Sequence, residues 1–223
     1  MLGSSMLLNV AVVAGCFFVG GIPVGLLIAR VNGIDDIRKY GSGNIGASNV
    51  LRTVGLKAGL AVWLVDVAKG ALPTLLAGYL LGYGSWYHAA AGFATILGHC
   101  FSPYLRFIGG RGVASSLGVL LALDWRVGLA AFAVWTGVTA ATRYISLGSI
   151  LAALSATAWY WLFTRAADIH VSLFVCVVAL GLLVIVRHVP NIGRLLAGTE
   201  AKIGQKAGES AEGAADGAEP EDA

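Results

Sequence analysis

The chain has 223 residues and a net charge of +3; 57% of its residues are hydrophobic and only 12% are charged. Soluble domains carry about 25% charged residues, so this composition, with a mean hydropathy of +0.80, excludes an ordinary soluble protein and predicts an integral membrane protein. The three cysteines (Cys16, Cys100 and Cys176) lie in or beside apolar runs without metal-ligand spacing. No metal, cofactor or nucleic-acid partner is expected.

Apolar runs follow one another along the chain, separated by the Gly, Asp, Arg or Pro residues that commonly end helices. They cover residues 6–29, 56–82, 85–105, 113–124, 127–142, 146–164 and 170–187. We expect an all-α polytopic membrane protein with about seven transmembrane helices, the fourth short enough to be tilted, partial or re-entrant. Residues 1–206 form the membrane domain. Residues 207–223 contain six acidic residues and no basic one, and are expected to form a disordered acidic tail.

The basic residues predict the orientation, because cytoplasmic loops of membrane proteins are enriched in Lys and Arg. With the N-terminus outside, the cytoplasmic loops hold twelve of the fifteen basic residues: Arg30, Arg38, Lys39, Arg52, Lys57, Arg106, Arg111, Arg143, Arg187, Arg194, Lys202 and Lys206. The C-terminus is then cytoplasmic. Three polar segments that contain glycine fall on this same side.

The first polar segment, residues 41–52, reads GSGNIGASNVLR. Its glycines open backbone N–H groups to a ligand, and its last residues begin a helix whose N-terminal amides can face an anion. The residues expected to bind are Gly41, Ser42, Gly43, Asn44, Gly46, Asn49 and Arg52. The alternative is a flexible loop in which Ser48 or Asn49 caps the following helix.

The second polar segment, residues 109–116, reads GGRGVASS and directly precedes an apolar helix. A cation and bare amides at a helix N-terminus favour a phosphate-bearing ligand. The residues expected to bind it are Gly109, Gly110, Arg111 and Gly112. The alternative is a tight turn whose arginine only sets topology.

The third polar segment, residues 187–200, reads RHVPNIGRLLAGTE. A histidine has an ordinary pKa near 6.5, so His188 can act as a general base at neutral pH, and Asn191 can orient it or the ligand. The alternative for His188 is a partner of the helix dipole. His99 can approach the same site. Ser146 and Ser149 cap the sixth span, bind ligand, or both.

Asp66 and Lys69 lie three residues apart inside an apolar run. Charges inside a membrane are costly when unpaired, so a structural ion pair is favoured over a proton relay.

Together, GSGNIGASNVLR, GGRGVAS and HxxNIxRLLxGTE resemble the acyl-phosphate:glycerol-3-phosphate acyltransferase family of bacterial membranes over residues 6–204. The chain departs from the family pattern at three places: Ser48 replaces a common Thr, Arg111 a common Lys, and Val189-Pro190 a common Arg-Glu. The resemblance implies an enzyme of the cytoplasmic membrane that moves a fatty acyl group from acyl phosphate to the sn-1 hydroxyl of glycerol 3-phosphate. The products are lysophosphatidic acid, for phospholipid synthesis, and phosphate.

The resemblance also implies the roles of single residues. Ser42 and Arg52 belong to the essential site, the loop 109–112 binds phosphate, and His188 and Asn191 assist. Glu200 holds the C-terminal segment by pairing with a basic residue. The implied partners are glycerol 3-phosphate, fatty acyl phosphate, membrane lipid and an enzyme that forms acyl phosphate.

The alternative from another class is a membrane transporter or channel for a small phosphorylated anion. Such a protein needs polar residues along several spans, and apart from Asp66 and Lys69 the spans here are bare.

Overall fold

The computed structural model describes residues 2–164 and 170–204, and the regular structure in these ranges is helical. The elements are α1 (Leu2–Gly21), α2 (Val24–Val31), the 3-10 turn η1 (Ile37–Lys39), α3 (Ala47–Thr53), α4 (Leu56–Leu81), α5 (Trp86–Cys100), the 3-10 turn η2 (Pro103–Leu105), α6 (Val113–Leu123), α7 (Trp125–Thr142), α8 (Ile145–Phe163), α9 (Val171–Arg187) and α10 (Val189–Leu196). The all-α prediction is confirmed for these residues. The tail predicted at 207–223 lies outside them.

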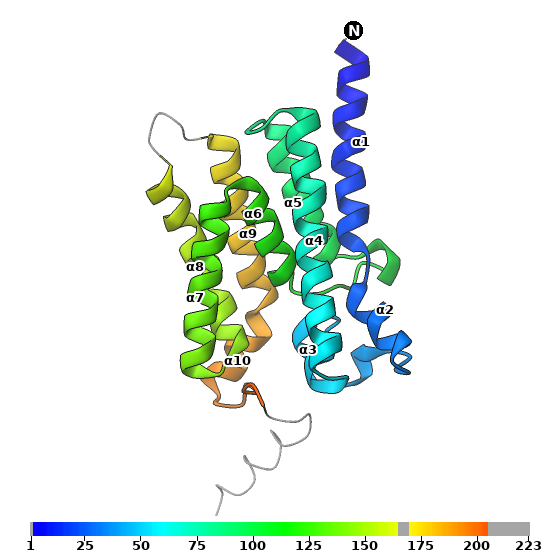
Figure 1. Ribbon diagram of the computed structural model, residues 1–223, viewed down its shortest axis with the longest axis vertical. Coiled ribbons are helices and arrows are strands. Elements are labelled where there is room, and N and C mark those ends of the chain that lie inside the picture. The colour runs from blue at the N-terminus through cyan, green and yellow to red at the C-terminus, as the bar shows by residue number, and fades with distance from the viewer. Residues whose placement is uncertain (1, 165–169, 205–223) are drawn as a thin grey trace, which may run out of the picture.

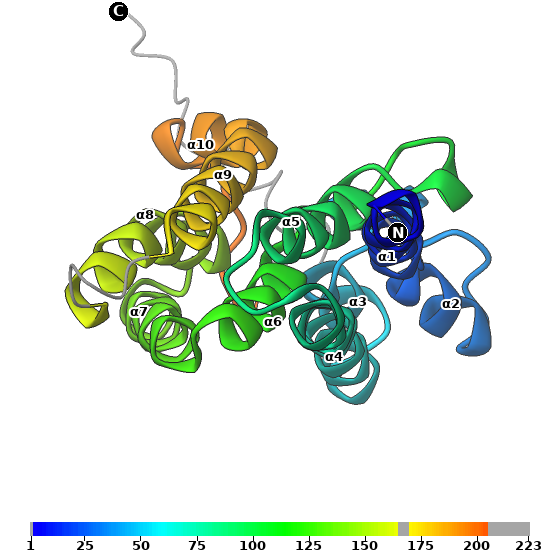
Figure 2. The same cartoon turned by 90° about the horizontal axis from the view of Figure 1, so that it is seen from above.

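The long helices form a bundle whose axes run roughly along the molecule, with α3 and α10 at the end opposite the N-terminus (Figure 1). Seen from above, α1 and α2 lie on one side, α7 and α8 on the other, and α5 and α6 between them (Figure 2). The main pairings are α1 on α5, α4 on α6 and α7 on α8.

Glycines at these pairings let helices approach closely. A Cβ atom would meet the backbone of α6 if added at Gly70, of α4 if added at Gly118, and of α1 if added at Gly98. Small residues at helix contacts are typical of membrane bundles, where close van der Waals packing replaces the hydrophobic effect as the driving force.

Polar groups lie inside the bundle and large apolar groups outside. On α4, Asp66 and Lys69 are 2% and 7% exposed, whereas Leu72 is 66% and Tyr79 87% exposed. This distribution is the reverse of that in a soluble protein and matches a lipid-facing exterior.

Among the described residues, three helical stretches are long and apolar enough to cross a membrane: Ser5–Val31, Leu56–Leu81 and Ile145–Phe163. A fourth results if α9 and α10, which meet at a 55° bend, count as one span. The 11 residues of α6 reach only roughly 16 Å at 1.5 Å per residue, well short of a bilayer core of about 30 Å. The count of seven crossings therefore stays a prediction.

The apolar run at residues 6–29 lies within one candidate span, Ser5–Val31, but forms two helices, because the chain breaks between α1 and α2 at Pro23. Proline lacks an N–H group and its ring clashes with the preceding turn. The carbonyl of Ile22 at this break accepts a 2.8 Å hydrogen bond from Nζ of Lys69. The break is thus satisfied from inside the bundle, as backbone at membrane depth requires.

Candidate active site

One cavity collects residues from all three polar segments. Of the residues expected to bind or act, those that line it are Ser42, Asn44, Gly46, Asn49, Arg52, Arg111, Gly112, Ser146, Ser149 and His188. Asp66 and Glu200, expected to be structural, line it as well. Of the residues that the structure describes, the remaining expected ones are not among those that line it: Gly41, Gly43, Gly109, Gly110, Asn191 and Lys69.

Asn49 organises the first loop. Its side-chain oxygen accepts a 2.9 Å bond from the Ser42 amide, and its Nδ2 donates to the carbonyls of Ile37, Tyr40 and Asn44 at 3.2, 3.0 and 2.8 Å. The side chain is only 1% exposed. A buried amide with these partners serves chiefly to hold the loop against α3.

Two glycines let the loop turn around Asn49. Gly41 has φ +56° and Gly43 φ +68°, and a Cβ at Gly41 would collide with the Asn49 side chain. Glycine adopts this left-handed region without strain. These glycines shape the loop but do not line the cavity.

Helix α3 begins at Ala47, and its N-cap is Gly46 without a side-chain cap bond, so neither Ser48 nor Asn49 caps it as the alternative reading of this segment required. Its last turn carries Arg52, whose Nη2 donates a 3.1 Å bond to the carbonyl of Ala201. Burial lowers the pKa of Arg52, with Glu200 opposing this shift. The guanidinium remains a cation on the cavity wall.

The second loop places the start of α6 at the cavity. Gly112 precedes the helix at φ +81°, and Ser116 donates the first intrahelical bond, 2.7 Å to Gly112. The N–H groups of the first helical turn therefore lack helix acceptors, and Val113 and Ala114 of that turn line the cavity. This is the arrangement of an anion site at a helix N-terminus.

Arg111 adds charge beside these amides. Burial lowers the pKa of its guanidinium to about 10; Glu200 opposes this shift, whereas Arg194, Arg52 and Arg187 add to it. The side chain is still protonated at neutral pH. A partly buried cation among other cations favours the binding of a ligand with negative charge.

His188 lies at the junction of α9 and α10 and is 2% exposed. Its Nδ1 is 2.8 Å from the carbonyl of Val184, an acceptor, so Nδ1 carries the proton and Nε2 is the free base. Burial lowers the pKa of His188 to about 4, so the imidazole is neutral at pH 7.

Glu200 links the end of the third polar segment to its helix, α10. Its Oε1 accepts a 2.6 Å bond from Nδ2 of Asn191, and its Oε2 pairs with Nε of Arg194 at 2.7 Å. Burial alone would raise the pKa of Glu200, but interactions with Asn191, Ser146 and Arg194 outweigh it and lower the pKa. The ionised carboxylate holds the chain that follows α10 against α10 itself.

The serines at the start of α8 do not cap it, because its N-cap is Tyr144 and has no side-chain cap bond. Ser149 donates to the carbonyl of Ile145 at 2.8 Å and accepts from Nε1 of Trp135 at 3.3 Å. Ser146 and Ser149 are both buried on the cavity side of this helix.

The sequence did not single out several residues of the cavity. Trp63 of α4 and Phe132 of α7 lie 5.8 Å apart between ring centroids, and Phe132 stacks on Trp135 at 5.9 Å. All three line the apolar part of the cavity. Hydropathy alone cannot separate such rings from rings that face lipid.

Polar side chains from the bundle interior complete the wall. His99 lies 3.2 Å from Oγ of Ser115 and 3.8 Å from Oδ1 of Asp66, which pairs with Lys69 at 2.8 Å. The expected approach of His99 to the site is therefore observed. In the described part of the chain, no group of three or more His, Cys, Asp or Glu residues could hold a metal ion.

Comparison with known proteins shows the family of the chain. Residues 10–198 match the family model described as glycerol-3-phosphate acyltransferase. The chain is 45% identical to a glycerol-3-phosphate acyltransferase of Dinoroseobacter shibae, over 85% of this chain and 90% of that one. It is also 45% identical to one of Geobacter sulfurreducens, over 87% and 97%.

Solved structures of an integral membrane glycerol 3-phosphate acyltransferase, PlsY, share the fold. Its glycerol 3-phosphate form superimposes with a TM-score of 0.83 at 39% identity, over 88% of this chain and 96% of that one. Its lysophosphatidic acid form gives a TM-score of 0.80 at 38% identity, over 88% and 95%. The predicted family is thereby confirmed: the chain belongs to the glycerol-3-phosphate acyltransferases, integral membrane enzymes of phospholipid synthesis.

Proposed function

We propose that the chain transfers a fatty acyl group from acyl phosphate to the sn-1 hydroxyl of glycerol 3-phosphate, releasing lysophosphatidic acid and phosphate. The observation that carries the proposal is the pairing, in one cavity, of the partly buried Arg52 and Arg111 with the N-terminus of α6. Both proposed substrates bear phosphate, which such groups bind well. The apolar half of the cavity, with Trp63 and Phe132, suits an acyl chain.

The proposed reaction is a direct transfer. The sn-1 oxygen of glycerol 3-phosphate attacks the acyl carbonyl, the new ester C–O bond forms, and the bond to the phosphate oxygen breaks with its electron pair leaving on phosphate. Arg52, Arg111 and the amides at the start of α6 offset the charge on the oxyanion and on the departing phosphate. The hydroxyl proton passes to Nε2 of His188 or to a substrate phosphate oxygen.

The rival route makes Ser42 a nucleophile that forms an acyl-enzyme. A serine nucleophile needs a fixed base, and the Ser42 contact present in the loop is from its backbone amide to Asn49. Intact-mass measurement after incubation with acyl phosphate alone separates the routes. An acyl adduct on Ser42 would overturn direct transfer.

The central experiment mixes the purified protein with acyl phosphate and glycerol 3-phosphate and follows phosphate release and lysophosphatidic acid. An acyl thioester as sole donor serves as the comparison. We expect turnover with acyl phosphate and acylation at sn-1, read from product fragmentation. Turnover with the thioester instead would reject the proposed donor. Retention of a phosphorylated anion without chemistry would favour the transporter, an alternative that gains nothing from family membership.

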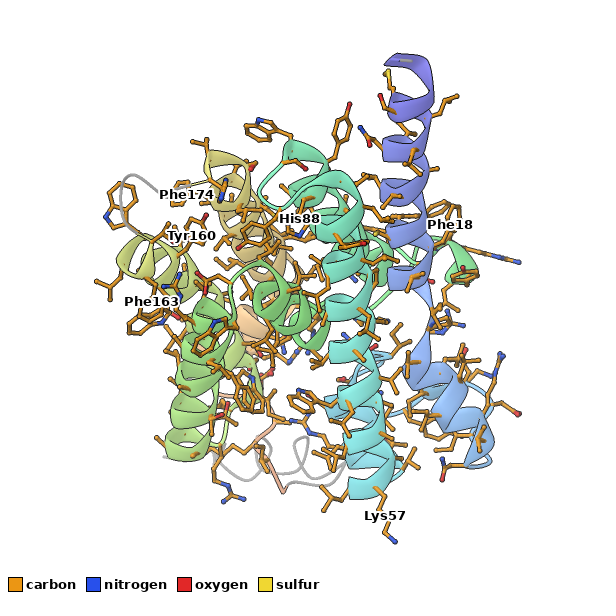
Figure 3. All side chains as sticks on the ribbon, turned by 45° about the horizontal axis from the view of Figure 1, so that its top comes forward. Phe18, Lys57, His88, Tyr160, Phe163 and Phe174 are labelled. Carbon is orange, nitrogen blue, oxygen red and sulfur yellow. The ribbon has the colours of Figure 1, made fainter. Side chains whose placement is uncertain are left out.

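Arg52→Ala tests the proposed site, with Lys57→Gln as the matched control. Lys57 is an exposed cation at the start of α4, at the end of the bundle where α3 lies (Figures 1 and 3). We expect Arg52→Ala to raise the KM for glycerol 3-phosphate or abolish turnover, and Lys57→Gln to leave both constants unchanged. An unchanged KM for glycerol 3-phosphate and unchanged turnover in Arg52→Ala would show that Arg52 is not part of the site.

We further propose seven crossings of a bacterial cytoplasmic membrane, with the N-terminus outside and the C-terminus and cavity on the cytoplasmic side. The N-terminus lies at the opposite end of the bundle from α3 and α10 (Figure 1), and the basic loops follow the positive-inside rule. On this side the enzyme meets soluble glycerol 3-phosphate and takes acyl phosphate from the enzyme that forms it. Reporter fusions to both termini test the orientation.

A further inference from the structure

Arg187, the last residue of α9, binds the backbone of the loop 109–112. Its Nε donates a 3.1 Å bond to the carbonyl of Gly110, and its Nη2 donates 3.0 Å bonds to the carbonyls of Gly109 and Gly110. In the described part of the chain Arg187 is not among the residues that line the cavity. It therefore contacts the loop without lining the cavity.

The bonds orient two successive peptide groups. In a trans peptide the C=O and N–H bonds point in opposite directions. The carbonyl of Gly109 points to Arg187, and the amide of Gly110 in the same peptide donates 3.0 Å to the carbonyl of His99 on the other side. The carbonyl of Gly110 also points to Arg187, so the amide of Arg111 points away from it.

This orientation decides the electrostatics of the loop. Carbonyl oxygens are the negative ends of peptide dipoles, and a phosphate group would be repelled if they faced it. With both carbonyls bound to Arg187 and the Gly110 amide bound to His99, the Arg111 amide is the loop N–H group turned away from Arg187, and Arg111 itself lines the cavity. The guanidinium also places one positive charge behind the loop.

The loop has little freedom to adopt another orientation. A Cβ atom at Gly109 would collide with the carbonyl of His99, and one at Gly110 with the His99 ring. The guanidinium is held in turn by the ring of Phe101, 5.4 Å from its centroid. A planar fork that spans two carbonyls and stacks on a ring is a task for arginine and not for lysine.

We propose that Arg187 is a positioning residue of the acyl transfer: it clamps Gly109 and Gly110 so that the loop and the N-terminus of α6 can bind the phosphate group of a substrate. The proposal rests on the function proposed above, in which this loop binds phosphate. Arg187 acts through the loop and does not touch substrate.

The experiment compares Arg187→Lys, Arg187→Gln and Arg187→Gly in the full chain, purified in lipid nanodiscs. Kinetics use acyl phosphate and glycerol 3-phosphate, with inorganic phosphate as competing inhibitor. We expect kcat to fall roughly 10- to 100-fold in all three variants, since small displacements of catalytic groups have effects of this size. The inhibition constant of inorganic phosphate should rise in the same variants, because the loop binds phosphate less tightly. Added guanidinium should restore activity to Arg187→Gly alone.

Arg30→Gln is the matched control, because Arg30 is exposed and its side chain donates one bond, 3.0 Å to the carbonyl of Asp35. It should leave kcat and phosphate inhibition unchanged. If Arg187→Gln or Arg187→Gly fails to fold, Arg187→Lys decides, since it can still donate to one carbonyl. Its thermal stabilisation by inorganic phosphate should then be smaller than that of the unsubstituted protein.

The outcomes are separable. Absence of turnover in the unsubstituted protein rejects the proposed acyl donor and says nothing of the clamp. If the unsubstituted protein turns over and folded Arg187→Lys has the same kcat and the same inhibition by phosphate, the clamp is overturned. The same holds if each loss of activity matches the loss of folded protein and guanidinium restores nothing.

Discussion

Asn191 donates a 2.6 Å hydrogen bond to Oε1 of Glu200, while Arg194 occupies the other carboxylate oxygen at 2.7 Å. Both side chains come from α10, and Glu200 comes from the segment that follows it. This carboxylate is thus the point at which the C-terminal segment is tied to the wall of the cavity, where Arg52 bonds the next residue, Ala201.

Glu200→Gln should destabilise the protein. The glutamine side chain must turn an NH2 group toward either Asn191 or Arg194, both of which donate, so either the buried Asn191 or the partly exposed Arg194 loses its acceptor. The loss of a buried hydrogen bond with a charged partner is about 1–3 kcal/mol. Thermal unfolding in detergent measures it, with Glu200→Asp, which keeps the charge, as the milder variant. Equal midpoints for Glu200→Gln and the unsubstituted protein would contradict the tie.

The buried histidine should make stability depend on pH. The pKa of His188 is lowered by burial to about 4, against about 6.5 in an unfolded chain, so between these values only the unfolded chain takes up the proton. The contribution of His188 is complete above pH 6.5 and is lost as the pH falls toward 4, by roughly 3 kcal/mol in all. Thermal midpoints between pH 7.5 and 5 should drop less in His188→Gln than in the unsubstituted protein. Equal drops of the thermal midpoint in His188→Gln and in the unsubstituted protein would disprove the lowered pKa of His188.

The ion pair inside α4 should be costly to break. Nζ of Lys69 lies 2.8 Å from Asp66 and also donates to the carbonyl of Ile22. Lys69→Met leaves the buried carboxylate of Asp66 and the carbonyl of Ile22 without this partner, and breaking a buried ion pair typically costs about 3–5 kcal/mol. The double variant Asp66→Asn with Lys69→Met should be less destabilised than Lys69→Met alone. Thermal unfolding of the unsubstituted protein, the single variant and the double variant measures these differences. A small loss of stability in Lys69→Met would contradict a tight ion pair.

Two glycines of the bundle should respond in opposite ways to alanine. A Cβ at Gly118 would collide with the backbone of α4 at Val67, whereas one at Gly137 of α7 meets nothing within 4 Å. Gly118→Ala should force α4 and α6 apart and cost roughly 1–3 kcal/mol. Gly137→Ala should be neutral or stabilise by up to about 1 kcal/mol through helix propensity. Equal thermal midpoints for the two variants would mean that α4 and α6 do not touch.

The sequence by itself determined the class, the helical segments and the family. Composition predicted a membrane protein, and the apolar runs from residue 56 onward match the helices closely, because hydropathy and helix ends are local properties of the chain. Three motifs together identified the acyltransferase family, and the match to the family model and to known relatives confirms it. The number of crossings and the roles of the site residues stay predictions.

Only the tertiary structure decided which side chains face the cavity and which hold it from behind. Asn49 was expected to bind substrate, yet its amide group is occupied by the loop around it. Arg187 counted only as a cytoplasmic charge, although it bonds Gly109, 78 residues earlier. Such roles depend on contacts between segments distant in sequence, and burial then changes the chemistry of each group, as it does the pKa of His188. No local pattern of residues contains that information.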